Sequence, residues 1–324
     1  MAFRVVKCGA APSIAPIETH MTLETIAIHS PGDMGQAVAQ VLAASGLKVI
    51  ASLKGRSPRT RALAAKANIE DAGTLAALVR GADMVLSILV PGQAENAARD
   101  MAQAMESAQA YPLYVDCNAI AAETSQRVGS IIEQTGARYV DASIIGPPPR
   151  RPGVTRFYAS GQHSGAFAAL NAHGLDVRVL EGPVGRASSL KTCYAALTKG
   201  LSALGGSILV AAEAQGLGQA LEAEFRLSQP GLLEWLERTF PGTPPKAHRF
   251  VGEMEEHAKA FAAQGLTPPP PPPPRKPVLG SKGSRENLSG EDARPILEEL
   301  SRRSDELEQL DVTWRFKDQD ASAT

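Results

Sequence analysis

Short apolar runs alternate with alanine-rich stretches of helical period over the first half of the chain, from Thr25 to about Ser160. The apolar runs have the length of strands, and the stretches between them are long enough for helices. Such an alternation predicts βαβ units and a parallel sheet, with right-handed connections and ligand sites at the carboxyl ends of the strands. The predicted strands are Thr25–His29, Lys48–Leu53, Met84–Val90, Tyr114–Asp116 and Tyr139–Ala142.

Helical patterns replace the strand-like runs after Gly182. A long apolar helix is expected from about Ala187 to Gln215, and its glycines at 200, 205 and 206 either weaken it locally or permit close packing. The further predicted helices are Gly218–Leu227, Gly231–Arg238 and Lys246–Gln264. The predicted fold class is therefore α/β, with an N-terminal Rossmann-type parallel sheet, an all-helical domain and a disordered Pro-rich tail.

A run of prolines, Pro268–Pro274, separates the helices from the tail. This run can only form polyproline II, which is a stiff spacer. The residues after it are charged, mixed in sign and poor in aromatics, so we expect disorder there apart from one short helix at about Asp292–Leu310. The predicted organisation is a disordered extension (1–22), a Rossmann domain (23–182), a helical substrate and dimerisation domain (183–266) and a linker with a mostly disordered tail (267–324).

Composition argues against several function classes. The 324 residues carry a net charge of −1, so no basic field indicates nucleic acid or an anionic membrane as a partner. No long uninterrupted apolar run is present, and we expect no transmembrane helix. The 3 cysteines and 6 histidines show neither metal-ligand nor disulfide spacing, which predicts a cytoplasmic protein without a metal site.

A phosphate-binding loop follows the first predicted strand. In the segment His-Ser-Pro-Gly-Asp-Met-Gly, Ser30, Gly32 and Gly35 occupy the three glycine slots of G-x-G-x-x-G. Gly32 lets the backbone approach a pyrophosphate, Gly35 lets the next helix pack on the strand, and the helix N-terminus offers free N–H groups. The serine departs from the motif, and a tight turn without a ligand is the alternative. The predicted cofactor-binding residues of this loop are Ser30, Gly32, Asp33, Met34 and Gly35.

The end of the second predicted strand indicates which dinucleotide is bound. An NAD site would place an acid there to bind the ribose 2′-hydroxyl, but the chain has Lys-Gly-Arg-Ser and no acid before Glu70. The planar guanidinium of Arg56 can pair with a 2′-phosphate, and Ser57 adds a hydroxyl. We therefore favour NADP(H) over NAD(H) as the cofactor, and the alternative is a solvated basic turn.

Four further segments follow the loop in order. Leu-Val-Pro-Gly begins at Leu89 and Asp-Cys-Asn at Asp116, both at predicted strand ends. Val-Asp-Ala-Ser-Ile-Ile-Gly-Pro-Pro-Pro begins at Val140, directly after a strand, and Gly-Arg-Ala-Ser-Ser-Leu-Lys begins at Gly185 on the long helix. From about residue 25 to residue 268, this ordered set resembles the β-hydroxyacid dehydrogenases, the superfamily of 6-phosphogluconate and 3-hydroxyisobutyrate dehydrogenases. It resembles most a branch with a phosphogluconate-dehydrogenase-like C-terminal domain.

The resemblance implies roles for residues around the predicted cleft. Ser143 and nearby backbone N–H groups, with Gly146, would hold a substrate carboxylate, although Pro147 replaces a glycine and has no N–H to donate. Asn118 would lie near the nicotinamide as a small polar catalytic residue. The turn that contains Val90 and Pro91 would contact the cofactor.

Lys191 matches the catalytic lysine of the superfamily, while Ala195 stands where the superfamily has asparagine. The helical spacing places Lys191, Ala195 and Thr198 on one face of small and polar residues. An ammonium that faces an apolar cleft has a lowered pKa, so it can donate a proton to a carbonyl or accept one from a hydroxyl. A solvated surface lysine is the alternative, and Tyr194 and Lys199 are the reserve acids.

Arg150, Arg151 and Arg156 follow the proline turn and flank the predicted site. They either recognise a substrate phosphate or second carboxylate or are ordinary loop charges.

The leading hypothesis is an NADP(H)-dependent oxidoreductase, a dehydrogenase or reductase that acts on a small carboxylate-bearing hydroxy or keto compound with Lys191 as general acid/base. Relatives with an acid in place of this lysine reduce imines, and Lys191 argues against that variant. The alternative is a non-catalytic NADP(H)-binding sensor or scaffold, because Ser30, Pro147 and Ala195 depart from the motifs.

The partners expected are the small-molecule substrate and a second copy of the chain. The resemblance implies a homodimer through the helical domain, in which Lys246 and Arg249 serve the neighbouring active site. The proline run has the form of an SH3 ligand, and a simple spacer is the alternative.

Overall fold

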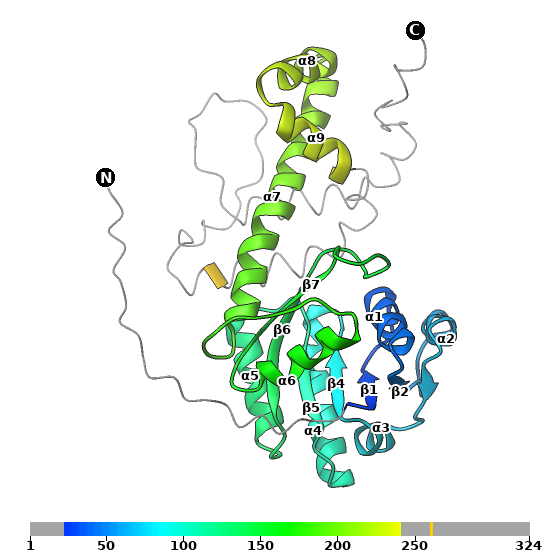
Figure 1. The fold of residues 1–324 in the computed structure, drawn as a ribbon. Helices are drawn as coiled ribbons and strands as arrows, with labels where there is room; N and C mark the ends of the chain where they lie inside the picture. The colour runs from blue at the N-terminus through cyan, green and yellow to red at the C-terminus, as the bar shows by residue number, and fades with distance from the viewer. Residues whose placement is uncertain (1–22, 241–259, 262–324) are drawn as a thin grey trace, which may run out of the picture.

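A single eight-stranded sheet forms the centre of the computed structural model, which describes residues 23–240 and 260–261 (Figure 1). The strand order is β3-β2-β1-β4-β5-β6-β7-β8. All neighbours pair in parallel except β6 and β7, which are antiparallel. The strands are β1 (Thr25–Ile28), β2 (Lys48–Ala51), β3 (Glu70–Asp71), β4 (Met84–Ser87), β5 (Leu113–Asp116), β6 (Tyr139–Ile145), β7 (Arg156–Ser160) and β8 (Val177–Val179).

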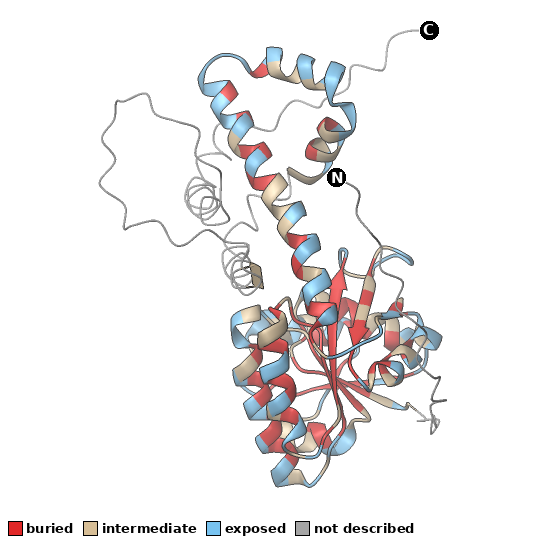
Figure 2. Cartoon of the chain, turned by 90° about the vertical axis from the view of Figure 1, so that its left-hand side faces the viewer, coloured by how far each residue is buried: buried red, intermediate tan, exposed pale blue. Residues whose placement is uncertain are grey.

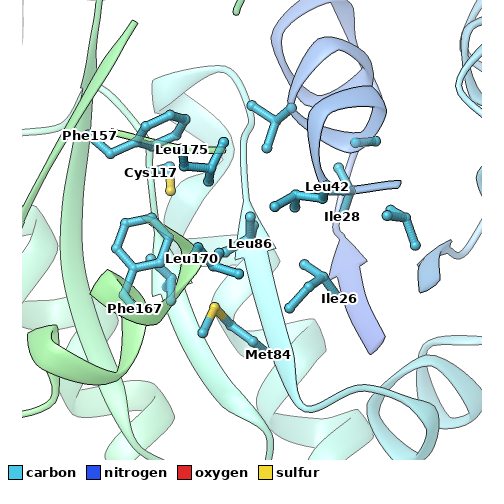
Figure 3. Close-up of a cluster of buried hydrophobic side chains, with 14 of the residues drawn as sticks. Ile26, Ile28, Leu42, Met84, Leu86, Cys117, Phe157, Phe167, Leu170 and Leu175 are labelled. Atoms are coloured by element: carbon cyan, nitrogen blue, oxygen red, sulfur yellow. The ribbon is translucent and has the colours of Figure 1, made fainter. Parts of the chain in front are cut away.

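Helices cover both faces of the sheet. One face packs against α1 (Asp33–Ala44), α6 (Ser164–Ala168) and the 3-10 helix η2 (Ala169–His173), and Figure 3 shows this core, in which Phe157 lies beside Leu175 and Phe167 beside Leu170. The other face packs against α3 (Leu75–Gly81), α4 (Ala94–Ala108) and α5 (Ala122–Glu133). The helix α2 (Pro58–Lys66) follows β2, and the 3-10 helix η1 (Pro91–Gln93) precedes α4.

The central strands are buried on both faces, as Figure 2 shows in red. Every residue of β4, β5 and β6 is buried. Parallel strands that are covered on both sides are expected to carry near-continuous apolar runs, which is why the sequence pattern revealed them.

The structure confirms the predicted α/β class and moves some strand ends. β2 ends at Ala51 and β4 at Ser87, which is earlier than predicted, whereas β6 continues to Ile145. β3, β7 and β8 were not predicted. β3 has two exposed residues, and β7 lies in the segment interpreted as an arginine-bearing loop.

Three helices extend beyond the sheet: α7 (Arg186–Ala214), α8 (Gly218–Ser228) and α9 (Pro230–Thr239), each within two residues of its predicted ends. A Cβ at Gly205 would collide with Leu236 of α9, and one at Gly206 with Phe240. These two glycines therefore permit close packing of α9, while Gly200 has no neighbour within 4 Å. Most of the predicted helix at 246–264, the extension at 1–22 and the Pro-rich tail lie outside the described residues.

The α7 helix is long and apolar enough to cross a membrane by length and composition, which the search for uninterrupted apolar runs did not anticipate. The same properties are found in core helices of soluble proteins, and 39% of its most apolar window is buried inside the molecule.

Candidate functional site

The candidate site lies at one edge of the sheet, because the carboxyl ends of β1, β4, β5 and β6 all meet there. The loops after these four strands contain the predicted glycine loop, Val90, Pro91, Asn118 and Gly146, whereas Arg56 and Ser57 follow β2 and Ser143 lies within β6. Lys191, in the second turn of α7, lies at the same edge because its Nζ donates a 2.6 Å hydrogen bond to the Ile144 carbonyl near the end of β6.

The predicted phosphate loop combines an open position at Gly32 with a close backbone approach at Gly35. Gly32 is the N-cap of α1 and supplies no side-chain cap to the first-turn N–H groups, and no atom lies within 4 Å of where its Cβ would be. A Cβ at Gly35 would lie 2.7 Å from the Ser30 carbonyl oxygen, so only glycine allows α1 to approach β1 this closely. Among the described residues, the non-glycine residues with positive φ are Asn68 and Gln109. Ser30 therefore occupies the first glycine slot without backbone strain.

Arg56 joins the end of β2 to the phosphate loop. Its Nη2 donates to the His29 carbonyl at 3.0 Å, and its side chain remains partly exposed. Ser57 caps α2, because its hydroxyl accepts from Thr60 N at 3.2 Å. Burial, and then the charge of Arg56, lowers the pKa of His29 to about 4, so Arg56 carries the positive charge at this position and His29 is neutral at physiological pH.

An acid that the sequence pattern missed lies beside the same strand end. Asp71 of β3 pairs with Ala51 of β2, and its Oδ1 accepts from Leu53 N at 3.0 Å and from Gly73 N at 2.8 Å. These backbone hydrogen bonds lower the pKa of Asp71. The carboxylate is 18 residues away from Leu53 in the chain, so only the strand pairing could have revealed it.

Asn118 is buried, and its hydrogen bonds link the ends of β4 and β5. Its Oδ1 accepts from Leu89 N at 2.5 Å, its Nδ2 donates to Ser87 Oγ at 3.0 Å, and its backbone N donates to Asp116 Oδ1 at 2.8 Å. The side chain therefore orients the turn after β4. Within that turn Val90 is 57% exposed and Pro91 begins η1, so both border the edge.

Ser143 lies inside β6, because this strand continues for three residues past the predicted end. Its side chain is completely buried, and its hydroxyl has no hydrogen-bond partner in the part of the chain that the structure describes. In this conformation the hydroxyl is shielded from water. Gly146, just after the strand, has φ +121°, and a Cβ there would collide with the Val154 carbonyl, so the position requires glycine.

Lys191 is mostly shielded from water, and this desolvation lowers its pKa to about 8. Ala195, one turn further along α7, is buried and offers no side-chain donor. The hydroxyl of Thr198 donates to the Tyr194 carbonyl at 3.0 Å, within its own helix. The hydrogen bond to Ile144 therefore orients the ammonium instead of the asparagine that the resemblance led us to expect.

Asp141 of β6 anchors the start of α7. Its carboxylate accepts three backbone hydrogen bonds from the first turn of this helix, the shortest from Gly185 N at 2.9 Å. Three hydroxyls also donate to it, those of Ser188 at 2.6 Å, Ser160 at 2.8 Å and Ser125 at 3.0 Å. A carboxylate at a helix N-terminus also interacts favourably with the helix dipole. Asp141 therefore fixes the helix that carries Lys191.

No group of three or more His, Cys, Asp or Glu side chains within residues 23–240 and 260–261 is arranged to hold a metal ion.

Two family models match the chain. The NAD binding domain of 6-phosphogluconate dehydrogenase matches residues 25–170, and a domain of unknown function, DUF1932, matches residues 212–272. A curated protein of Methanothermus fervidus, described as an uncharacterized 28.5 kDa protein, is 27% identical over 158 residues. This match covers 49% of the chain and 59% of that relative, so the chain spans rather more than half of its length.

Solved structures share the fold over most of the chain. A conserved protein, described as structurally similar to 3-hydroxyacid dehydrogenases, is 26% identical with a TM-score of 0.62, and the match covers 86% of this chain and 98% of that one. The 3-hydroxyisobutyrate dehydrogenase of Mycobacterium tuberculosis, solved with L-serine, is 19% identical with a TM-score of 0.64, covering 87% and 94%. An imine reductase of Myxococcus stipitatus, solved with NADP+, is 17% identical with a TM-score of 0.52, covering 89% and 94%.

The anchoring role of Asp141 predicts a large effect on stability. Asp141→Asn removes the charge and places an amide N–H₂ among six donors, so we expect the free energy of unfolding to fall by about 3 kcal/mol or more, measured by urea denaturation. The matched control is Asp83→Asn, because Asp83 accepts from two backbone N–H groups but is only half-buried. We expect the control to cost about 1 kcal/mol. Equal losses in the two variants would contradict the special role of Asp141.

Proposed function

Because residues 25–170 match the NAD binding domain of 6-phosphogluconate dehydrogenase and solved relatives share the fold, we propose that this chain is a dehydrogenase or reductase of the β-hydroxyacid dehydrogenase superfamily, which uses NADP(H) and acts on a small carboxylate-bearing hydroxy or keto compound. Lys191 is the general acid/base. The observation that carries this proposal is the shielded ammonium of Lys191, held beside the end of β6 at the edge that also contains the phosphate loop.

The residues at this edge fit a dinucleotide. The uncapped N-terminus of α1 and the open space at Gly32 suit a diphosphate. The close approach of α1 to β1 at Gly35 directs the helix N-terminus toward that position. The bound cofactor supplies or accepts the hydride. Arg56 supports NADP(H), because its guanidinium lies between β2 and the phosphate loop, where it can meet a 2′-phosphate.

Lys191 handles the proton at the substrate oxygen. In reduction, its protonated Nζ donates to the carbonyl oxygen, and in oxidation the neutral amine accepts the hydroxyl proton. A pKa of about 8 makes both forms accessible near neutral pH. The positive charge also favours a substrate with a carboxylate, which is the substrate class that we propose.

A non-catalytic NADP(H)-binding sensor or scaffold is the second candidate. It is favoured by the buried hydroxyl of Ser143 and by Ala195, which supplies no orienting amide. Such a protein would bind NADPH as the enzyme does but would have no turnover, so Lys191→Ala would have no effect on activity.

We further propose a soluble cytoplasmic homodimer that pairs through α7. Six apolar residues on this helix follow a 4-3-4-3-4 spacing, and five of them are among the exposed large hydrophobics. They are Leu190, Tyr194, Leu197, Leu201, Leu204 and Ile208. This is the spacing with which one helix packs along another, and a stripe of this length exposed to water would be unfavourable in a monomer.

Arg56→Ala tests the cofactor proposal. We expect wild-type protein to bind NADPH more tightly than NADH, and the variant to raise the Kd for NADPH about tenfold or more while the Kd for NADH hardly changes. Titration followed by nicotinamide fluorescence measures both constants, and Asp71→Asn is the companion variant because Asp71 is the nearby acid. A preference for NADPH that survives in Arg56→Ala would show that another group meets the 2′-phosphate.

Lys191→Ala tests the catalytic proposal on any substrate that a screen of small hydroxy and keto acids identifies. We expect kcat to fall by about 10²–10⁴-fold with the Kd for NADPH unchanged. In the wild type, the reduction rate should fall as pH rises through about 8, because the ammonium loses its proton, and the oxidation rate should rise over the same interval. Lys199→Ala is the matched control on the same helix, and a larger effect there would move the role to Lys199.

Leu197→Glu tests the dimer, because Leu197 is the most exposed member of the stripe at 70%. Light scattering after size exclusion should give twice the chain mass for wild type and the chain mass for the variant. Val179→Glu, on the edge strand β8, changes another exposed large apolar residue outside the stripe and should leave the dimer intact. A wild-type monomer would refute the proposal.

A further inference from the structure

The segment that joins β6 to β7, residues 146–155, is a rigid projection rather than a free loop. Its two ends are in contact, because Gly146 lies against the Val154 carbonyl and Thr155 Oγ1 donates to the Pro147 carbonyl at 2.5 Å. Prolines at 147, 148, 149 and 152 fix the backbone φ over much of its length. We call this segment the proline strap, and its tip is held in place by these constraints.

The strap extends over the α1 side of the sheet edge (Figure 1) and places Arg150 against the phosphate loop. Arg150 Nη2 lies 3.9 Å from Oδ1 of Asp33, the first residue of α1. The two side chains are 65% and 53% exposed, so the pair contributes little to stability and exchange of either partner costs little.

The surroundings of Arg150 favour an anion. The three prolines at 147–149 have no N–H groups, so the backbone there cannot supply the donors expected from the glycine motif. A pocket of about 470 Å³ lies beside the strap, bordered by Arg150, Arg151 and Val41 of α1, so these guanidinium groups are not packed into the protein. A planar guanidinium is well suited to pair with phosphate oxygens.

We propose that Arg150 is a cofactor-binding residue whose guanidinium pairs with the diphosphate at the N-terminus of α1. When the cofactor binds, Arg150 exchanges the carboxylate of Asp33 for phosphate oxygens. The diphosphate is then held between the backbone N–H groups of α1 and a side chain from a segment more than 100 residues later in the chain. This inference rests on the proposed function, because it requires that the phosphate loop binds a nicotinamide dinucleotide.

Arg150→Ala tests this arrangement by fluorescence titration with NADPH and with NADH. The diphosphate is common to both nucleotides, so we expect both Kd values to rise by the same factor, about tenfold. This differs from Arg56→Ala, which changes the ratio of the two constants. The matched control is Arg226→Ala, because Arg226 is a similarly exposed arginine that pairs with Glu222 at 2.7 Å on α8, beyond the sheet. We expect the control to bind as wild type does.

The outcomes separate the two proposals. If wild type binds neither nucleotide, the proposed function fails and the role of Arg150 fails with it. If wild type binds but Arg150→Ala matches it for both nucleotides, only the inference about Arg150 is overturned. A loss confined to NADPH would also overturn it, because it would place Arg150 at the 2′-phosphate. A change confined to the KM of the substrate would overturn it too, by assigning Arg150 to substrate recognition.

Discussion

The position of Lys191, the proposed general acid/base, depends on one buried carboxylate, that of Asp141. Six donors from α5, β7 and the first turn of α7 meet on its two oxygens, so the start of α7 is fixed to the centre of the sheet. Without that anchor, the start of the 29-residue helix would be held by its packing and by the hydrogen bond from Lys191 to Ile144, so the position of Lys191 relative to β6 would be less well fixed. The sheet, the helix terminus and the site are therefore coupled through a single side chain.

The same carboxylate shapes the charge beneath the site. Asp116 is the neighbour of Asp141 across the β5–β6 pair, and burial raises its pKa to about 7, with the charge of Asp141 adding to the effect. Its Oδ2 has no partner within the described chain, so ionisation of Asp116 would place charge on an unpaired, buried oxygen. Desolvation likewise is what lowers the pKa of Lys191.

The sequence predicted features that depend on residues close together in the chain. It did not predict contacts between residues that are far apart in the chain. The strand pattern and the predicted phosphate loop are local features that spacing indicates, and Lys191 was singled out by its place in a local motif that resembles one of the superfamily. Asp141 anchors residues 44 to 47 positions away, and Arg56 reaches a carbonyl 27 positions away, so neither contact leaves a periodic signal. Ser143 was placed after a strand because the polar residues in β6 interrupt its apolar run, although pairing with β7 continues the strand to Ile145.

The three departures from the superfamily motifs change the donors of the site and leave its scaffold intact. Ser30 adopts a backbone conformation that any residue can adopt, and Ala195 is small enough to be buried on α7. Pro147 removes an N–H group but stiffens the segment that carries Arg150. On the interpretation developed above, anion binding therefore shifts from backbone and amide groups to the charged side chains of Arg56, Arg150 and Lys191. Salt screens charge pairs of exposed groups more strongly than buried backbone contacts. The affinity of this protein for NADP(H) should therefore depend more on ionic strength than that of a site built mainly from backbone N–H groups.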